Sequence, residues 1–292
     1  MNYIKHLPIA LVFCLFSCKN GKSSSQVSYI PQDTLTAFYL PAIPAMLNTP
    51  ELRADFLVKH YWDNVNFADT NYIHHPEVTE QAWADYCDLL NHVPLETAQQ
   101  AMRNVIDRTN VDKKVFTYIT DLADKYLYDP NSPMRNEEFY IPVLEAMIAS
   151  PVLNETEKIR PQARLKLAQK NRIGTKALNF TYTLASGAQG SLYQLKAEYL
   201  LLFINNPGCQ ACTETIEGLK NAPIINQLLQ EKKLVLLSIY PDEELDEWKK
   251  HLSEFPNEWI NGYDKKFTIK EEQVYDLKAI PTLYLLDKDK TV

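Results

Sequence analysis

The chain of 292 residues lacks several features that would assign it to a specialised class of protein. Beyond the first 17 residues no apolar run is long enough to cross a bilayer, and no basic block favours binding to nucleic acid. Internal repeats are absent, and residues 33–172 contain no glycine. With 46% hydrophobic residues, 23% charged residues and a net charge of -7, the composition is typical of a soluble globular protein.

Cysteine is scarce, and two of the five cysteines lie near the N-terminus. Lys5 precedes an apolar run at residues 7–16, which ends in Ser17 and Cys18. This pattern resembles a bacterial lipoprotein signal peptide, which implies cleavage of residues 1–17 and attachment of lipid to the sulfur of Cys18. An ordinary secretory signal, in which Cys18 has no role, is the alternative.

The residues after this leader are polar. Residues 18–32 would be the lipidated cysteine followed by a flexible tether. By resemblance to lipoproteins of Gram-negative bacteria, Lys19 implies the outer membrane rather than retention at the inner one. We therefore expect a protein that is anchored in the cell envelope by its lipid and has its domains in the periplasm, a compartment in which disulfides persist.

The mature chain would keep three cysteines, Cys87, Cys209 and Cys212. Cys87 follows Trp83 by four residues and shares its helix face. We expect a buried, inert thiol at this position rather than a regulatory one. His74 and His75 are adjacent, and this spacing cannot place both on one helix face, so no metal site is predicted there.

Residues 33–172 have helical periodicity and predict an all-α bundle of unknown function. Prolines and N-capping residues mark several of the helix starts. The expected helices begin near Thr49, Pro76, Pro94, Val115 and Phe139. Pro142 is expected to interrupt the last of them. The aromatic residues of this part are expected in its core or at an interface rather than around a cofactor.

From residue 173 onward the pattern changes to that of strands, some of them continuous apolar runs. The expected elements are strands at residues 180–184, 192–195, 199–204, 234–239 and 279–287, and helices at residues 213–231 and 243–255. Two uninterrupted apolar strands joined by a helix predict a parallel βαβ unit that is covered on both faces.

The most informative motif is Cys209-Gln-Ala-Cys212, which follows the apolar strand at residues 199–204 and a turn of four turn-forming residues. At a helix N-terminus, unpaired N–H groups and the helix dipole lower the pKa of a cysteine from about 8.5 to roughly 3.5–7.5. Cys209 is therefore the predicted nucleophile, and Cys212, one turn deeper, is predicted to resolve the mixed disulfide. The alternatives are a static disulfide or half of a zinc site, which would need two more ligands.

Pro281 stands at the start of the last predicted strand, where a proline is normally disfavoured. Its presence is explained if the Ile280–Pro281 bond is cis and faces the cysteine pair. Backbone groups beside it would then be free to pair with an incoming chain.

The order of strand, Cys209-x-x-Cys212, helix, strand and Ile280-Pro281 resembles the thioredoxin superfamily, in particular its membrane-anchored periplasmic thiol-disulfide reductases and their peroxiredoxin-like relatives. The resemblance covers residues 173–292 and implies an α/β domain with a central mixed sheet and helices on both faces, without the family's last strand and helix. It implies that Cys209 attacks, Cys212 resolves and Pro281 shapes the substrate groove. Residues 33–172, with the segment Phe56–Asp69, are similar to an uncharacterised helical domain that is fused to such modules in lipoproteins of gut anaerobes.

One family feature is missing from this chain. Phe203 lies near the strand position at which thioredoxin has a buried acid, so the usual proton acceptor is absent. Glu214 or Glu217 on the active helix could replace it. The alternative is that both of these carboxylates are solvated.

These observations together predict a lipid-anchored thiol-disulfide oxidoreductase that reduces protein disulfides through a Cys209/Cys212 cycle, with no cofactor other than that disulfide and no metal. Its partners would be envelope proteins that contain disulfides and a thiol electron donor, and not nucleic acid. The alternative is a non-catalytic envelope lipoprotein. In that case the helical domain binds a partner and the thioredoxin-like module is structural.

Overall fold

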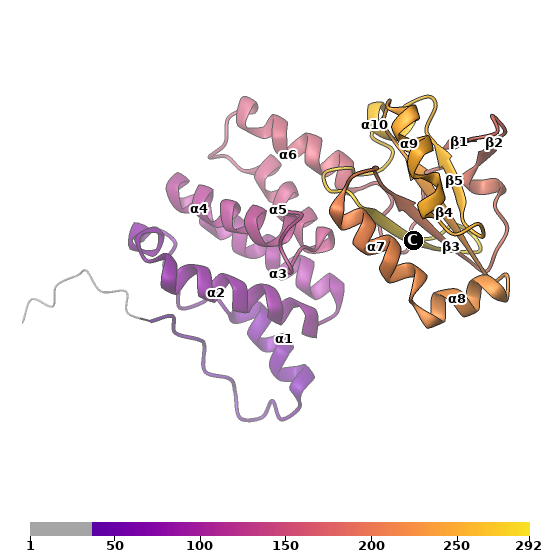
Figure 1. The fold of residues 1–292 in the computed structure, drawn as a ribbon. Helices are drawn as coiled ribbons and strands as arrows, with labels where there is room; N and C mark the ends of the chain where they lie inside the picture. Colours follow the sequence, from indigo (N-terminus) through magenta and orange to yellow (C-terminus); the bar gives the residue numbers. More distant parts are fainter. Residues whose placement is uncertain (1–36) are drawn as a thin grey trace, which may run out of the picture. The chain divides into compact units, whose positions relative to one another are not determined.

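The structure is a computed structural model that describes residues 37–292. The predicted signal peptide, the lipidation site Cys18 and the tether at residues 18–32 lie outside the described residues. No helix within residues 37–292 is both long and apolar enough to cross a membrane. Figure 1 shows a helical region, residues 37–172, and a sheet region, residues 173–292.

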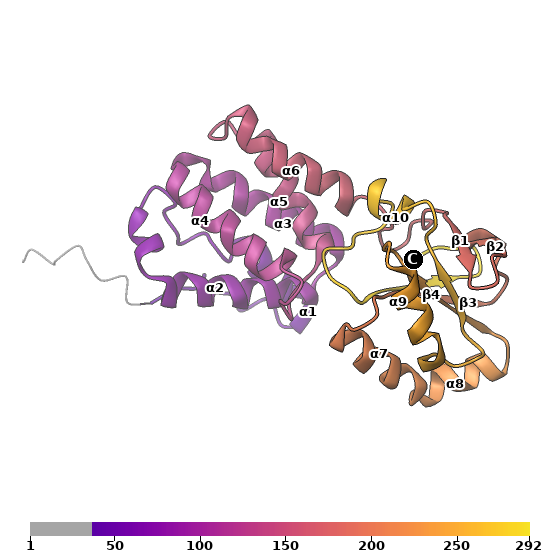
Figure 2. The same ribbon diagram turned by 45° about the horizontal axis from the view of Figure 1, so that its top comes forward.

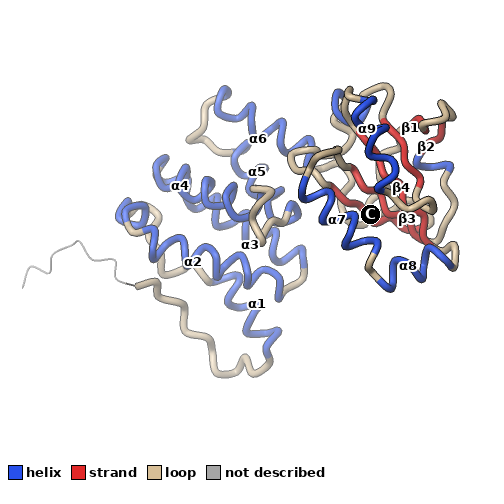
Figure 3. The backbone as a smooth tube through the Cα atoms, viewed as in Figure 1, coloured by secondary structure: helices blue, strands red, loops and turns tan. Residues whose placement is uncertain are grey.

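The helical region consists of α-helices joined by short helical turns, and Figure 3 shows no strand in residues 37–172. Its α-helices are α1 (Pro50–His60), α2 (Pro76–Leu89), α3 (Leu95–Arg108), α4 (Lys113–Ala123), α5 (Glu137–Ala149) and α6 (Glu155–Ala168). The turns are η1 (Thr70–His74), η2 (Leu90–His92), η3 (Thr109–Val111) and η4 (Asp124–Tyr128). The predicted all-α class is confirmed. Helix α6 was not predicted, although Asn154 and Glu157 form a capping box at its start.

Helix α5 continues through Pro142, so the predicted interruption is wrong. Proline has no N–H group and leaves the carbonyl of Glu138, four residues earlier, without its helical partner. The side chain of Gln99 on α3 donates a hydrogen bond to this carbonyl at 3.0 Å. A neighbouring helix thus replaces the bond that proline removes, and α5 remains intact.

Aromatic rings fill the core of the helical region. Trp62, Trp83 and Tyr86 are each no more than 2% exposed, and their ring centroids lie 5.7 to 6.2 Å apart. Tilted and edge-to-face arrangements of this kind are favourable for aromatic pairs. These three aromatic residues therefore belong to the core of the region, whereas Tyr39 is 70% exposed.

Within residues 173–292 six strands form a mixed sheet in the order β2-β1-β5-β4-β3-β6. The strands are β1 (Thr181–Leu184), β2 (Gln189–Ser191), β3 (Tyr199–Ile204), β4 (Leu234–Tyr240), β5 (Ile260–Tyr263) and β6 (Thr282–Asp287). The helices are η5 (Leu192–Gln194), α7 (Gln210–Lys220), α8 (Pro223–Gln230), α9 (Leu245–His251), η6 (Leu252–Glu254) and α10 (Thr268–Glu271). Strand β3 pairs parallel to β4 and antiparallel to β6, which lies at an edge of the sheet among the described strands.

The side chains of β3 are divided between two cores, one on each face of the sheet. Leu200 and Leu202 pack in one core, whereas Leu201 and Phe203 pack in the other, together with Ile216 of α7. Figures 1 and 2 show α7 and α8 following one another beside β3 and β4. Burial on both faces explains why this strand is apolar throughout, and it confirms the predicted βαβ unit.

Several predicted boundaries in the sheet region are wrong for local reasons. The helix predicted to reach residue 231 ends at Lys220, and α8 begins at Pro223, because proline at the first position of a helix favours a new start. The predicted returning strand at residues 192–195 is mainly the turn η5, and the strand itself is β2. The predicted helix at residues 243–255 is reduced to α9 and η6, and β5 was not predicted.

Candidate active site

The first part of the site is the turn from β3 into α7. Gly208 has a φ of 73°, in the left-handed region that glycine adopts without steric cost. Cys209 is the N-cap residue of α7, and its sulfur accepts a hydrogen bond from the N–H of Cys212 at 3.2 Å. The local sequence therefore places the sulfur of Cys209 at the positive end of the helix dipole.

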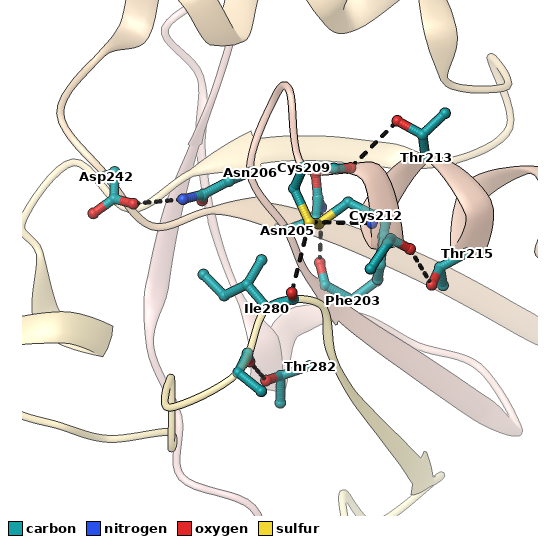
Figure 4. Close-up of a disulfide and its surroundings, with 12 residues drawn as sticks. Phe203, Asn205, Asn206, Cys209, Cys212, Thr213, Thr215, Asp242, Ile280 and Thr282 are labelled. Atoms are coloured by element: carbon teal, nitrogen blue, oxygen red, sulfur yellow. Dashed lines mark hydrogen bonds between the residues drawn. A yellow bond between two sulfur atoms is a disulfide. The ribbon is translucent and has the colours of Figure 1, made fainter. Parts of the chain in front are cut away.

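The two cysteines of this turn form a disulfide, which Figure 4 shows, and their Cα atoms are 5.1 Å apart. Cys212 is 2% exposed, whereas Cys209 is partly exposed. Cys209 is therefore the cysteine of the pair that is open to a second protein. One accessible cysteine beside one buried cysteine is the arrangement that sequential thiol-disulfide exchange requires.

The loop before β6 lies against the cysteine pair. Its Ile280–Pro281 peptide bond is cis, and the carbonyl oxygen of Ile280 is 3.6 Å from the sulfur of Cys209 (Figure 4). The hydroxyl of Thr282 donates a hydrogen bond to the carbonyl of Ala279 at 2.5 Å, which closes the turn around the proline. The tertiary structure thus brings residues 280–281 to a cysteine 71 positions earlier in the chain.

Glu214 and Glu217 lie on the solvent side of α7, which favours the alternative that they are solvated over a role as proton acceptors. Both side chains are exposed. Glu214 accepts a hydrogen bond from Gln210 at 2.9 Å, and Glu217 pairs with Lys220 at 2.9 Å. They follow Cys212 by two and five residues, which corresponds to roughly 200° and 140° around a helix. Helical geometry therefore directs them away from the buried sulfur and toward solvent.

No acid lies at the expected position on β3. Phe203 occupies this position, is fully buried and packs against Trp259 with 6.4 Å between ring centroids. Two residues later, the amide of Asn205 donates a hydrogen bond to the hydroxyl of Ser238 at 2.8 Å, and both residues are at most 3% exposed. The sequence indicates Asn205 only as a turn former, because its contact with Ser238 depends on the pairing of β3 with β4.

The carboxylate of Asp242 holds the turn between β3 and α7. Asp242 accepts hydrogen bonds from Asn206 at 2.7 Å and from Lys270 at 2.8 Å. Burial acts to raise the pKa of Asp242, but the hydrogen bonds from Lys270 and Asn206 outweigh burial, so this pKa lies below its ordinary value. Asp242 is therefore ionised at neutral pH and ties the turn before Cys209 to the end of β4. No motif in the sequence marks this residue.

The third described cysteine is in the helical region. Cys87 is free and 2% exposed, and burial raises the pKa of its thiol. The predicted buried thiol is confirmed. Only the thiolate form of cysteine is strongly nucleophilic, so a raised pKa disfavours reaction at this thiol. Across residues 37–292 no cluster of three His, Cys, Asp or Glu residues could hold a metal ion.

Comparison with known proteins agrees with this architecture. The family model of a domain of unknown function (DUF5106) matches residues 17–171, and a thioredoxin-like model matches residues 197–292. The crystal structure of a thioredoxin-like protein from Bacteroides caccae is 83% identical in sequence. The match covers 89% of this chain and 94% of that one, with a TM-score of 0.87. The chain belongs to the thioredoxin-like proteins. Its helical region belongs to the DUF5106 family, so both resemblances seen in the sequence are confirmed.

Other solved structures match a part of this thioredoxin-like protein. The C-terminal domain of an uncharacterized protein from Bacteroides fragilis is 70% identical over 42% of this chain and 87% of that chain, with a TM-score of 0.41. A domain of a possible thiol-disulfide isomerase from Cytophaga hutchinsonii is 27% identical over 42% of this chain and 82% of that chain, with a TM-score of 0.35. No curated protein matches the chain.

Proposed function

We propose that this thioredoxin-like protein is a lipid-anchored thiol-disulfide oxidoreductase of the cell envelope and that it reduces disulfides in other proteins. The observation that carries the proposal is the unequal exposure of the cysteine pair. Cys209 is partly exposed at the N-terminus of α7, and Cys212 is buried one turn later. A purely structural disulfide needs neither an accessible sulfur nor a position at a helix N-terminus.

The first step of the proposed cycle occurs at Cys209. In the reduced protein its thiolate, stabilised by the N–H of Cys212 and the dipole of α7, attacks one sulfur of the substrate disulfide. A mixed disulfide forms between Cys209 and the substrate. The other substrate sulfur leaves as a thiolate and takes up a proton.

The second step releases the substrate. Cys212 gives up its thiol proton to water or to the second substrate sulfur as that sulfur leaves, and it attacks the sulfur of Cys209. The bond between Cys209 and the substrate breaks, the second substrate thiolate leaves, and the Cys209–Cys212 disulfide forms. Two electrons have then passed to the substrate. Before the next cycle an external dithiol must donate two electrons to reduce the Cys209–Cys212 disulfide.

Reduction of insulin tests the catalytic part of the proposal. With dithiothreitol as the donor, the protein without residues 1–18 should reduce insulin disulfides faster than its Cys209→Ser variant. Cys87→Ala is the matched control, because it removes a cysteine far from the site in sequence and should keep the activity. If the unmodified protein is no faster than Cys209→Ser, the enzyme assignment is wrong, and the non-catalytic lipoprotein becomes the better description.

The direction of the reaction is tested by the reduction potential of the Cys209–Cys212 pair. Equilibration with glutathione buffers should give a value nearer to about -270 mV, as in a reductant, than to about -120 mV, as in a strong oxidant. A value at the oxidising end would mean that the protein forms disulfides instead of reducing them.

The anchoring part of the proposal depends on Cys18 and the polar tether. When the full chain is expressed with radioactive palmitate, it should become labelled and partition into detergent, and the Cys18→Ala variant should do neither. Labelling of both proteins, or of neither, would contradict a lipid anchor on Cys18.

A further inference from the structure

The segment between α10 and β6, residues 272–281, carries the backbone that faces the redox pair. The carbonyl of Ile280 lies 3.6 Å from the sulfur of Cys209. Residues 272–281 themselves contain neither helix nor strand. The position of this carbonyl therefore depends on the side chains that hold the segment in place.

Lys278, two residues before Ile280, joins this segment to the helical region. Its ammonium group donates a hydrogen bond to Glu137 in the first turn of α5 at 2.7 Å and pairs with Asp276 at 2.6 Å. It also lies 3.9 Å from the ring centroid of Tyr128. The side chains of Lys278 and Asp276 are only 14% and 10% exposed, so water screens this pair less than a surface ion pair.

The other end of the segment is also held by the helical region. Lys170 donates hydrogen bonds to the carbonyls of Glu272 and Gln273, at 3.0 and 2.7 Å. The amide of Asn171 donates to the carbonyl of Val274 at 2.7 Å, and Asn171 is 7% exposed. The described residues 37–292 all belong to one compact unit, in which these contacts lie.

We propose that Lys278 is a positioning residue through which the helical region sets the geometry of the redox site. Glu137 and Tyr128 hold Lys278, and Lys278 holds the short backbone that ends at the Ile280 carbonyl opposite Cys209. This inference rests on the proposed thiol-disulfide function. It gives the DUF5106 region a role in the reaction, because the region fixes the loop beside which a substrate chain must lie to reach Cys209.

The charges of this cluster determine which variants are informative. Glu137 also pairs with Arg135 at 3.1 Å, so it keeps a positive partner when Lys278 is changed. Asp276 would keep the hydrogen bond from the backbone N–H of residue 278 at 2.9 Å but would lose its positive partner, which is unfavourable for a buried charge, so Lys278→Met can affect folding as well as position. Glu137→Gln is milder because it leaves the pair of Lys278 with Asp276 intact and removes the charge that the helical region places beside Lys278, together with the exposed pair of Glu137 with Arg135.

The experiment compares full-length Lys278→Met, Lys278→Arg and Glu137→Gln with the unmodified protein. Lys220→Met is the matched control, because Lys220 pairs with an acid on α7 but makes no contact with residues 272–281 in the described structure. Three quantities are measured. They are kcat and KM for insulin reduction, the rate at which iodoacetamide alkylates Cys209 in the reduced protein, and the melting temperature.

We expect Lys278→Met and Glu137→Gln to lower kcat/KM roughly fivefold, mainly through KM, a size typical of coupling between contacting residues. Alkylation of Cys209 should change at least twofold, Lys278→Arg should recover most of the loss, and Lys220→Met should match the unmodified protein. If Lys278→Met does not fold, Glu137→Gln carries the test.

Two results separate this inference from the proposed function. If the unmodified protein is active and both variants match it in kcat/KM and in alkylation rate, the positioning role is refuted while the function stands. If no protein reduces insulin, the function fails, and the alkylation rates still decide the inference: equal rates in all variants overturn it, and a change confined to the Lys278 and Glu137 variants supports it.

Discussion

Asp242 offers a sharp test of how the turn before Cys209 is held. The substitution Asp242→Asn keeps the size of the side chain and removes its charge. It leaves an amide oxygen that Asn206 can still reach, and it removes the ionic partner of Lys270. The perturbation is therefore confined to the difference between a charged and a neutral acceptor.

The magnitude can be estimated from the two contacts. Lys270 is 48% exposed, so water screens its ion pair, which contributes little. The bond from Asn206 to a carboxylate contributes about 1.5–3 kcal/mol, and a neutral bond contributes about 1 kcal/mol. We therefore expect Asp242→Asn to lower the free energy of unfolding by about 1 kcal/mol at pH 7.

The loss should depend on pH in a defined direction. The pKa of Asp242 lies below its ordinary value of 3.8, because hydrogen bonds from Lys270 and Asn206 outweigh the effect of burial. A lowered pKa in the folded state means that the carboxylate contributes its full stabilisation above about pH 5. That stabilisation disappears as the pH falls below about 4 and through the folded pKa. The difference between the two proteins should therefore shrink at low pH.

Urea unfolding at pH 7 and pH 3.5, followed by tryptophan fluorescence, measures this difference. Asp246→Asn is the matched control, because Asp246 is 94% exposed and should contribute nothing measurable at either pH. The reasoning is refuted if Asp242→Asn is as stable as the unmodified protein at pH 7. A loss that is equally large at pH 3.5 would refute the charge-based explanation.

Three other predictions concern single side chains. Gln99→Leu removes the side-chain bonds to the carbonyl and to the carboxylate of Glu138 and should lower the free energy of unfolding by about 1 kcal/mol in urea titrations; unchanged stability would show that these bonds are dispensable. Cys212→Ser should accumulate a mixed disulfide with an oxidised substrate on non-reducing gels, because the resolving thiol is gone, and its absence would contradict attack by Cys209. Iodoacetamide should modify Cys87 only after denaturation, because burial hides the thiol and raises its pKa. Mass spectrometry measures this modification, and fast labelling of Cys87 in the native reduced protein would contradict the prediction.

Local patterns predicted the elements that long apolar runs and capping residues specify. Strand β3 is apolar throughout and β4 is apolar except for Ser238, because both faces of each strand are buried, and this remains visible in the sequence without any knowledge of their neighbours. Shorter elements such as β5 and η5 were missed or misplaced. Four or three residues carry too little periodicity, and their conformation depends on the strands and side chains that they contact.

Within the site, too, some features follow from the local sequence and others only from the tertiary structure. The sequence by itself determined the cysteine pair at a helix start and a proline where a strand should begin, because turn formers and spacing act over a few residues. Only the tertiary structure decided that the Ile280 carbonyl lies opposite Cys209, that Asp242 holds Asn206, and that Glu214 and Glu217 face solvent. These relations depend on how β3, β4 and β6 pair. Such pairing joins residues far apart in the chain, and no local pattern encodes it.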